Sequence, residues 1–186
     1  MTNRGSRDKG TKVVMIWPFK RNKSTALYNA VAQTSRNSLF YTKMGVPDTL
    51  DGRFEMLCLF SALVMLRLHD LDRQGKAISQ DLFDKMFKQA EKSLREIGIG
   101  DMGVPKHMKR MMSGFNGRIT SLERALKADN PKDELKDHLK RNLYSTKQDI
   151  AAEEIEQMAD YIILYNSSLD DMDLEDLRKG RLPPVT

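Results

Sequence analysis

Residues 53–68 read RFEMLCLFSALVMLRL, and this stretch decides the fold class. At about 100° per residue, its apolar side chains point to nearly every side of a helix. These side chains are Phe54, Leu57, Phe60, Leu63, Val64 and Leu68. A helix that is apolar all round belongs at the centre of a bundle. The uncharged part, Met56 to Leu66, is shorter than the roughly 20 residues that cross a bilayer, so we expect a buried helix.

The rest of the chain shows helical periodicity, with no alternating strand pattern, hairpin signal or internal repeat. We therefore expect an all-α, single-domain bundle of about six helices around the central apolar helix. The expected helices span about 24–34, 49–71, 79–97, 105–126, 131–143 and 148–167. In this division, residues 1–23 form a flexible basic arm, 24–169 the folded domain and 170–186 an acidic, loose tail.

The positive charge of the chain is concentrated at its N-terminus. Residues 1–23 contain seven Lys or Arg and one Asp, a net charge of +6, whereas the whole chain carries +5. The remaining residues therefore carry −1 and are close to neutral. A strongly basic body is excluded, and DNA is not expected as a partner.

The basic arm also carries aromatic rings next to its cations, at Trp17, Phe19, Lys20 and Arg21. This mixture suits a membrane interface, where rings lie at headgroup level and cations meet anionic lipid. One interpretation is therefore a membrane tether, and the other is a disordered tail with isolated aromatics. A secretory signal is not expected, because the apolar run 13–19 is short and contains Pro18.

Residues 98–103, GIGDMG, match the dinucleotide-binding pattern G-x-G-x-x-G. That pattern holds a pyrophosphate where a parallel strand ends and a helix begins. Here the glycines follow an amphipathic helix, and Pro105 then suits the first turn of the next helix. We interpret the segment as a connection between two helices, with Gly98 just past the end of the first. A nucleotide-binding enzyme is the alternative that this pattern alone would suggest.

Cations crowd the predicted start of the next helix. Lys106, Lys109 and Arg110 fall in its first turn, where each opposes the helix macrodipole at a cost of about 0.3–1 kcal/mol. Arg118 follows on the flank of the same helix, nearer its apolar side. A solvated face explains part of this pattern, but the concentration of charge in one turn indicates a docking surface.

The same helix contains two glycines, Gly114 and Gly117, which cost about 1 kcal/mol each relative to alanine. They lie away from the apolar stripe that runs from Met108 to Leu126. Bare backbone there would allow a partner helix to approach closely, and simple tolerance of glycine is the alternative. Met102, before the cationic turn, adds a polarizable side chain that adapts to apolar partners.

No catalytic or metal-binding pattern accompanies this surface. His69, His107 and His138 have no companion at ligand spacing, and no CxxC or HExxH motif occurs. The single cysteine, Cys58, lies in the apolar helix, and we expect a buried, inert thiol. The sequence favours a non-enzymatic binding protein without a metal or cofactor.

One long motif resembles a known family. It reads Leu94-Arg95-Glu96-x-Gly98-x-Gly100-Asp101-x-x-Val104, followed by Lys106, Met108-Lys109 and Phe115-x-Gly117-Arg118. This pattern resembles the ubiquinol–cytochrome c chaperone family, whose members are assembly factors of the respiratory cytochrome bc1 complex. The similarity extends from about Phe54 to Tyr144. Asn116 departs from it, because the family more often has an aromatic residue there.

The resemblance implies a non-enzymatic, all-α chaperone that binds newly made cytochrome b or bc1 assembly intermediates. Mitochondrial members work with a small partner protein and near the ribosome, so a ribosome or RNA contact is the second expectation. The short arm without an import sequence is similar to bacterial cytoplasmic members that work at the inner membrane. The mitochondrial matrix side is the alternative location.

We expect the client-binding surface to join the glycine turn to the basic helix start. Cations would meet acidic or headgroup-facing parts of the client, and apolar side chains would shield a hydrophobic segment. The predicted contact residues are Gly98, Gly100, Asp101, Met102, Val104, Lys106, Lys109, Arg110, Gly114, Gly117 and Arg118.

Overall fold

The computed structural model describes residues 25–147 and 149–185, which form eight helices and no strand. The all-α prediction is confirmed. Two short helices, α2 and α8, come in addition to the six that the periodicity predicted. The helices are α1 (Thr25–Ser35), α2 (Ser38–Thr42), α3 (Leu50–Leu71), α4 (Arg73–Glu96), α5 (Val104–Leu126), α6 (Pro131–Arg141), α7 (Ala152–Asp170) and α8 (Leu174–Arg178).

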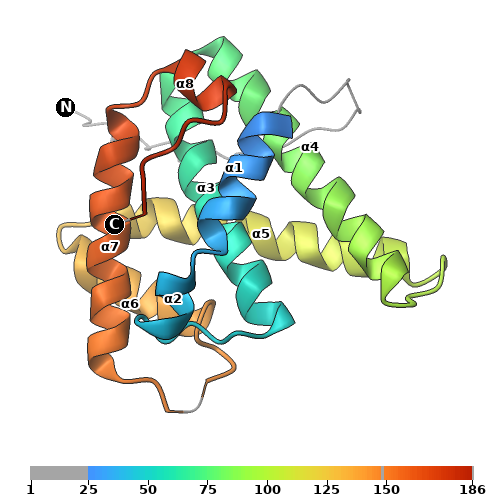
Figure 1. Ribbon diagram of the computed structural model, residues 1–186, viewed down its shortest axis with the longest axis horizontal. Helices are drawn as coiled ribbons and strands as arrows, with labels where there is room; N and C mark the ends of the chain where they lie inside the picture. Colours follow the sequence, from blue (N-terminus) through green and yellow to red (C-terminus); the bar gives the residue numbers. More distant parts are fainter. Residues whose placement is uncertain (1–24, 148, 186) are drawn as a thin grey trace, which may run out of the picture.

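Helix α3 is the centre of the bundle, as its apolar sequence predicted. Every residue from Cys58 to Met65 is buried, so no side of this part of the helix faces solvent. Four helices, α1, α4, α5 and α7, pack around it (Figure 1). Aromatic rings fill the contact with α7, where Phe60 meets Tyr165 edge to face at 5.0 Å between ring centroids.

Helix α4 begins at Arg73, six residues before the start that we predicted at Ser79. The reason is Asp72, whose carboxylate accepts a hydrogen bond of 2.8 Å from the Gly75 N–H and caps the helix. Gly75 is needed at this sharp turn, because a Cβ there would lie 2.2 Å from the Leu68 carbonyl oxygen. Ser79 is buried inside the helix instead.

Helix α7 begins at Ala152, later than the predicted start at residue 148. The Glu154 carboxylate accepts hydrogen bonds from the Ala151 N–H at 3.3 Å and from Lys147 Nζ at 3.0 Å, which defines the helix start. Ile162 is buried, whereas Ile163 is exposed. Consecutive side chains point about 100° apart around a helix, so Ile163 lies at the solvent side of the buried face.

The C-terminal segment was predicted to be a loose acidic tail, and the structure contradicts this for most of it. Asp173 caps α8 by accepting a hydrogen bond of 2.8 Å from the Asp176 N–H, and Leu177 is fully buried. Helix α8 packs against α1 (Figure 1). Gly180, with φ +75°, passes so close to α1 that a Cβ would lie 2.7 Å from the Ala26 carbonyl oxygen. The acidic residues are therefore the outer face of a packed segment.

The basic arm, with its predicted membrane tether at Trp17, Phe19, Lys20 and Arg21, lies outside the described residues. Among the helices that are described, none combines the length and the apolar character needed to cross a membrane.

Candidate protein-binding surface

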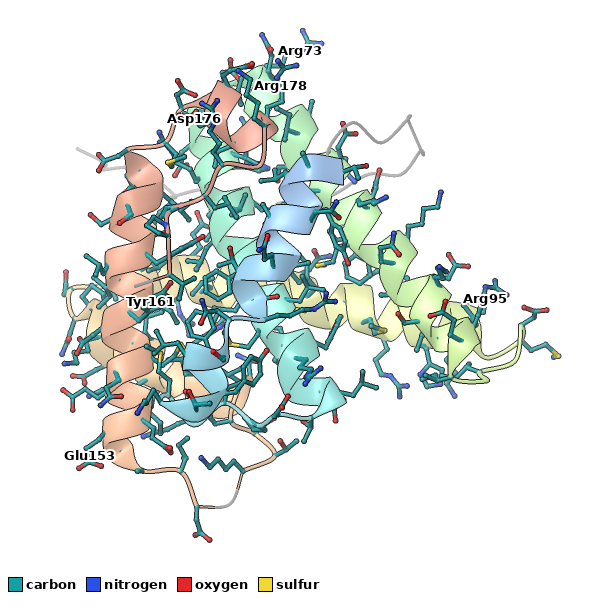
Figure 2. The ribbon with its side chains drawn as sticks, viewed as in Figure 1. Arg73, Arg95, Glu153, Tyr161, Asp176 and Arg178 are labelled. Carbon is teal, nitrogen blue, oxygen red and sulfur yellow. The ribbon has the colours of Figure 1, made fainter. Side chains whose placement is uncertain are left out.

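Helices α4 and α5 form an antiparallel hairpin that extends beyond the rest of the bundle (Figure 1). We define the hairpin tip as residues 97–103, which connect the two helices. Arg95 marks the tip end of α4, and Arg73 marks the opposite end of the same helix (Figure 2). The glycine pattern of the sequence thus lies on a projecting turn between helices, and no strand precedes it in the part of the chain that the structure describes.

The end of α4 explains the first glycine of the motif. Gly98 has φ +88° and donates to the Arg95 carbonyl, while the Ile99 N–H donates to the Leu94 carbonyl, both at 3.0 Å. This pair of bonds is a Schellman motif, which requires the left-handed conformation that glycine adopts at no steric cost. The role of Gly98 as a helix stop is confirmed.

Pro105 lies in the first turn of α5, as predicted; the helix begins at Val104, and Gly103 is its N-cap without a side-chain cap. Only Lys106 of the three cations therefore lies in the first turn, and Lys109 and Arg110 lie in the second. Their opposition to the macrodipole is weaker than we argued from the sequence, because the effect falls off within one turn. Val104 is buried, so it anchors the hairpin and does not face a partner.

The three cations near the start of α5, Lys106, Lys109 and Arg110, are exposed, as predicted. Lys106 and Lys109 make no ion pair with any residue that the structure describes. Arg110 contacts the Nδ1 atom of His107 at 2.8 Å, a neighbour without a negative charge. These three charges therefore remain available to a partner.

A long polar face continues from these cations along α5. At about 100° per residue, Gly117 lies three turns from Lys106 on the same side of the helix. Beyond Arg110 this face carries glycine or short polar side chains, and Arg124 lies at its end as a further cation. The exposed residues beyond Arg110 are Ser113, Asn116, Gly117, Thr120 and Arg124.

The tip carries two exposed apolar side chains and one acidic side chain that is held in an ion pair. Met102 is 98% exposed and Ile97 is 61% exposed. The Asp101 carboxylate forms an ion pair with Arg95, which also bonds Glu91 at 3.0 Å. Asp101 therefore fixes the turn to α4 rather than offering a free negative charge.

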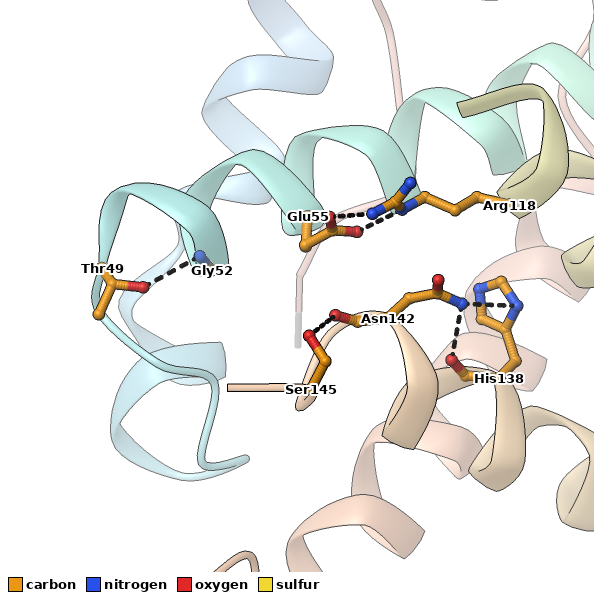
Figure 3. A network of polar contacts seen from close by, with 7 residues as sticks. All are labelled: Thr49, Gly52, Glu55, Arg118, His138, Asn142 and Ser145. Carbon is orange, nitrogen blue, oxygen red and sulfur yellow. Dashed lines mark hydrogen bonds and ion pairs between the residues drawn. The ribbon is translucent and has the colours of Figure 1, made fainter. Parts of the chain in front are cut away.

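Arg118, a predicted contact residue, instead forms an internal ion pair (Figure 3). Its Nε donates to Glu55 Oε2 at 2.7 Å, and a second bond completes a bidentate pair between α5 and α3. Burial raises the pKa of the Glu55 carboxyl above its ordinary value, and the bonds from Arg118 partly oppose that rise. The pair holds the base of the hairpin against the central helix and leaves little of Arg118 for a partner.

The two glycines of α5 have different surroundings, although we expected the same role for both from the sequence. A Cβ at Gly114 would lie 2.7 Å from Arg118 Nη1, so this glycine makes room for the ion pair. A Cβ at Gly117 would meet no atom within 4 Å. Crowding inside the fold therefore explains Gly114, contrary to our reading, whereas Gly117 has no internal reason to be glycine.

A buried histidine, His138, lies next to this ion pair. From the sequence we considered it only as a possible metal ligand. His138 of α6 is 4% exposed, and its Nδ1 lies 2.9 Å from Ser121 Oγ and 3.5 Å from Asn142 Nδ2. Burial, reinforced by the charges of Arg141 and Arg118, lowers the pKa of His138 to about 4. The ring is therefore neutral at neutral pH. No sequence signal marks this role, because its partners lie on different helices.

The described residues hold no cluster of three His, Cys, Asp or Glu side chains that could bind a metal. Cys58 is fully buried, and burial raises the pKa of its thiol, which keeps it in the unreactive protonated form. This side of the molecule therefore presents exposed cations of α5 and exposed apolar side chains of the tip.

The chain is similar to several known proteins. The family described as ubiquinol-cytochrome C chaperone matches residues 42–184. The chain is 25% identical over 166 residues to the ubiquinol-cytochrome-c reductase complex assembly factor 1 of Xenopus laevis, covering 86% of this chain and 82% of that protein. It is similar to the crystal structure of the Cbp3 homolog from Brucella abortus, with a TM-score of 0.77 and 31% identity over 88% of this chain and 89% of that one.

Proposed function

The chain belongs to the ubiquinol-cytochrome c chaperone family, a family of non-enzymatic assembly chaperones, and from this membership we propose that it assists assembly of the cytochrome bc1 complex. In this proposal its client is newly made cytochrome b, or an intermediate that contains it. The client contact is the outward face of α5, and the hairpin tip lies next to it. Arg118, Gly114 and Val104 are left out of the contact, because each has a role inside the fold.

One observation carries the proposal: Lys106, Lys109 and Arg110 are exposed side by side on α5 without an acidic partner among the described residues. Three uncompensated cations on one helix repel one another, so they weaken the isolated protein slightly. A client with acidic or headgroup-facing loops would relieve that repulsion, and complementary charge raises both specificity and association rate.

The middle of the α5 face supports close approach of a client segment. Gly117 is surrounded by open space, and its exposed neighbours Ser113, Asn116 and Thr120 are short. A helix of the client could cross here with its backbone near that of α5, as small residues allow in helix pairs. The cations on either side, Arg110 and Arg124, would then contact the polar ends of that segment.

The test is the variant Lys106→Glu/Lys109→Glu/Arg110→Glu in cells that depend on this protein for bc1 assembly. We expect far-UV circular dichroism and the melting temperature to stay near those of the wild type, because none of these side chains has an acidic partner to lose. Assembled bc1 complex, measured by native gels and cytochrome b difference spectra of membranes, should fall by about tenfold or more.

A matched control distinguishes the effect of this surface from the effect of the change in net charge. Arg73→Glu/Lys76→Glu/Lys140→Glu makes the same change of net charge at exposed positions in the first turn of α4 and near the end of α6, and we expect normal assembly. A second variant, Gly117→Leu, adds bulk at a position where a Cβ would meet no atom within 4 Å, and it should also block assembly. Normal assembly with both the basic-face variant and Gly117→Leu would refute the proposed surface.

A further inference from the structure

We propose that the hairpin tip binds a membrane surface. Ile97 and Met102 enter the interface of an anionic lipid bilayer, while the cations at the start of α5 contact its headgroups. This goes beyond the proposed client contact, because it gives the tip a separate partner. The client would then meet α5 while the chaperone rests on the membrane that receives the client.

Two exposed apolar side chains lie at this projection, and one of them is the most exposed large hydrophobic side chain among the described residues. Among the described residues only five large hydrophobic side chains are exposed, and two of them, Ile97 and Met102, lie on the tip. Met102 is 98% exposed, so it contributes nothing to folding from its present position. An apolar side chain held fully in water at the end of a projecting hairpin indicates a partner that removes it from water.

The shape of the tip favours a lipid surface over a protein groove. A Cβ at Gly98 or Gly100 would meet no atom within 4 Å, so the turn is convex and surrounded by open space. A convex turn with two apolar side chains cannot enclose a hydrophobic segment of a client. It can, however, be surrounded by the headgroups and upper acyl chains of a bilayer.

The cations lie at the depth that such an insertion requires. Arg110 is six residues beyond Val104, about 9 Å along the helix axis, which compares with the roughly 5–10 Å to which interfacial elements enter a bilayer. Lys106, Lys109 and Arg110 have no acidic partner among the described residues, so they remain free to bind lipid phosphates. Each cation near an anionic surface strengthens binding about fivefold.

The acidic residues of the hairpin do not cancel this effect. The segment 85–110 contains seven Lys or Arg and three Asp or Glu. Each of the three acids is paired: Asp101 and Glu91 with Arg95, and Glu96 with Lys92 at 3.5 Å. An approaching anionic membrane therefore meets a positive surface.

The experiment is flotation of the full-length purified protein with vesicles, in the absence of any client. The probes are vesicles of phosphatidylcholine with phosphatidylglycerol and vesicles of phosphatidylcholine alone. We expect binding only to the anionic vesicles, weakened by salt, and a loss of tenfold or more in Ile97→Asn/Met102→Asn. The matched control, Leu50→Asn/Leu164→Asn, removes two exposed apolar side chains elsewhere and should bind like the wild type.

Three outcomes would overturn the proposal. The first is no binding to anionic vesicles. The second is equal binding by the tip variant and the wild type, especially if Trp17→Ser/Phe19→Ser abolishes binding, because the N-terminal arm would then be the membrane contact. The third is normal vesicle binding by the tip variant together with loss of cytochrome b capture, which would make the tip a protein contact. Since no client is present in flotation, failure here leaves the proposed chaperone function standing.

Discussion

His138 shows how one buried side chain makes the stability of this protein depend on pH. Its ring lies among α3, α5 and α6, where it hydrogen-bonds Ser121 or Asn142 and faces the guanidinium groups of Arg118 and Arg141. The carboxylate of Glu55, on α3, is held by Arg118 and does not contact the imidazole. A proton on the ring would thus be desolvated, and it would also face two positive charges.

The pKa of His138 is about 4 in the folded protein against 6.5 for an ordinary histidine. Its contribution to stability is therefore complete above about pH 6.5 and is lost as the pH falls toward 4, because the unfolded chain takes up the proton first. We expect urea unfolding of the wild type to lose about 2 kcal/mol from this group between pH 7 and pH 5. His138→Gln should lack that component, and parallel pH curves for the two proteins would contradict the assignment.

Helix α5 performs two tasks with opposite faces. Its apolar side, with Phe115, Ile119 and Leu122, is buried against the rest of the bundle, and Arg118 ties it to Glu55 of α3. Its other side is exposed, and we propose that it contacts the client. Gly114 and Gly117 are three residues apart, yet one belongs to the internal contact and the other to the exposed face.

This difference gives a matched pair of variants on one helix. Gly117→Ala should raise the free energy of unfolding by about 0.5–1 kcal/mol, because alanine favours the helix and the added methyl group meets nothing. Gly114→Ala should be less stable than Gly117→Ala by about 1 kcal/mol or more, because its methyl group pushes on the Arg118 guanidinium that Glu55 holds.

Urea denaturation at pH 7 measures both variants. In an Arg118→Met background the difference between the two alanine variants should shrink, as expected when a double-mutant cycle removes the shared partner. Equal stability of Gly114→Ala and Gly117→Ala in the native background would show that the ion pair does not constrain the helix.

At the scale of the whole molecule, the C-terminal segment completes the bundle. Leu177 of α8 is fully buried, and the chain after it crosses α1 closely enough at Gly180 to exclude any side chain. Helix α8 thus covers a part of α1 that would otherwise face water, and the first and last described helices stabilise each other.

We expect Leu177→Ala to lower the free energy of unfolding by about 2–4 kcal/mol, the usual cost of truncating a buried leucine. Leu174→Ala, at a partly buried position of the same short helix, is the matched control and should cost clearly less. Urea titration of both variants measures the difference. A loss below about 1 kcal/mol for Leu177→Ala would mean that the C-terminal segment is not part of the cooperative core.

Most of the bundle could be predicted because burial imposes a period on the sequence. The central helix was recognisable from apolar residues on all its sides, and α5 from its regular apolar stripe, of which Phe115, Ile119 and Leu122 are buried. The predicted start of α4 was wrong because Asp72, directly after the last residue of α3, caps the helix in place of Ser79. The C-terminal helix was missed because five residues contain too few apolar positions to show a period.

The predictions for the candidate surface also divide into those that local sequence patterns support and those that depend on distant contacts. The exposure of Lys106, Lys109 and Arg110, together with the helix stop at Gly98, followed from local pattern alone. The internal roles of Arg118 and Gly114 did not, because Glu55 is 63 residues away from Arg118 in the chain.

The sequence by itself determined that this chain folds as a helical bundle around residues 50–71 and that a basic, glycine-containing turn connects two of its long helices. Both follow from local physics: helical periodicity, capping and the conformational freedom of glycine act within a few residues. Only the tertiary structure decided which cations are free, which glycine is crowded and which apolar side chains lie on a projecting tip. These properties depend on contacts between residues far apart in the chain, and no local pattern records them.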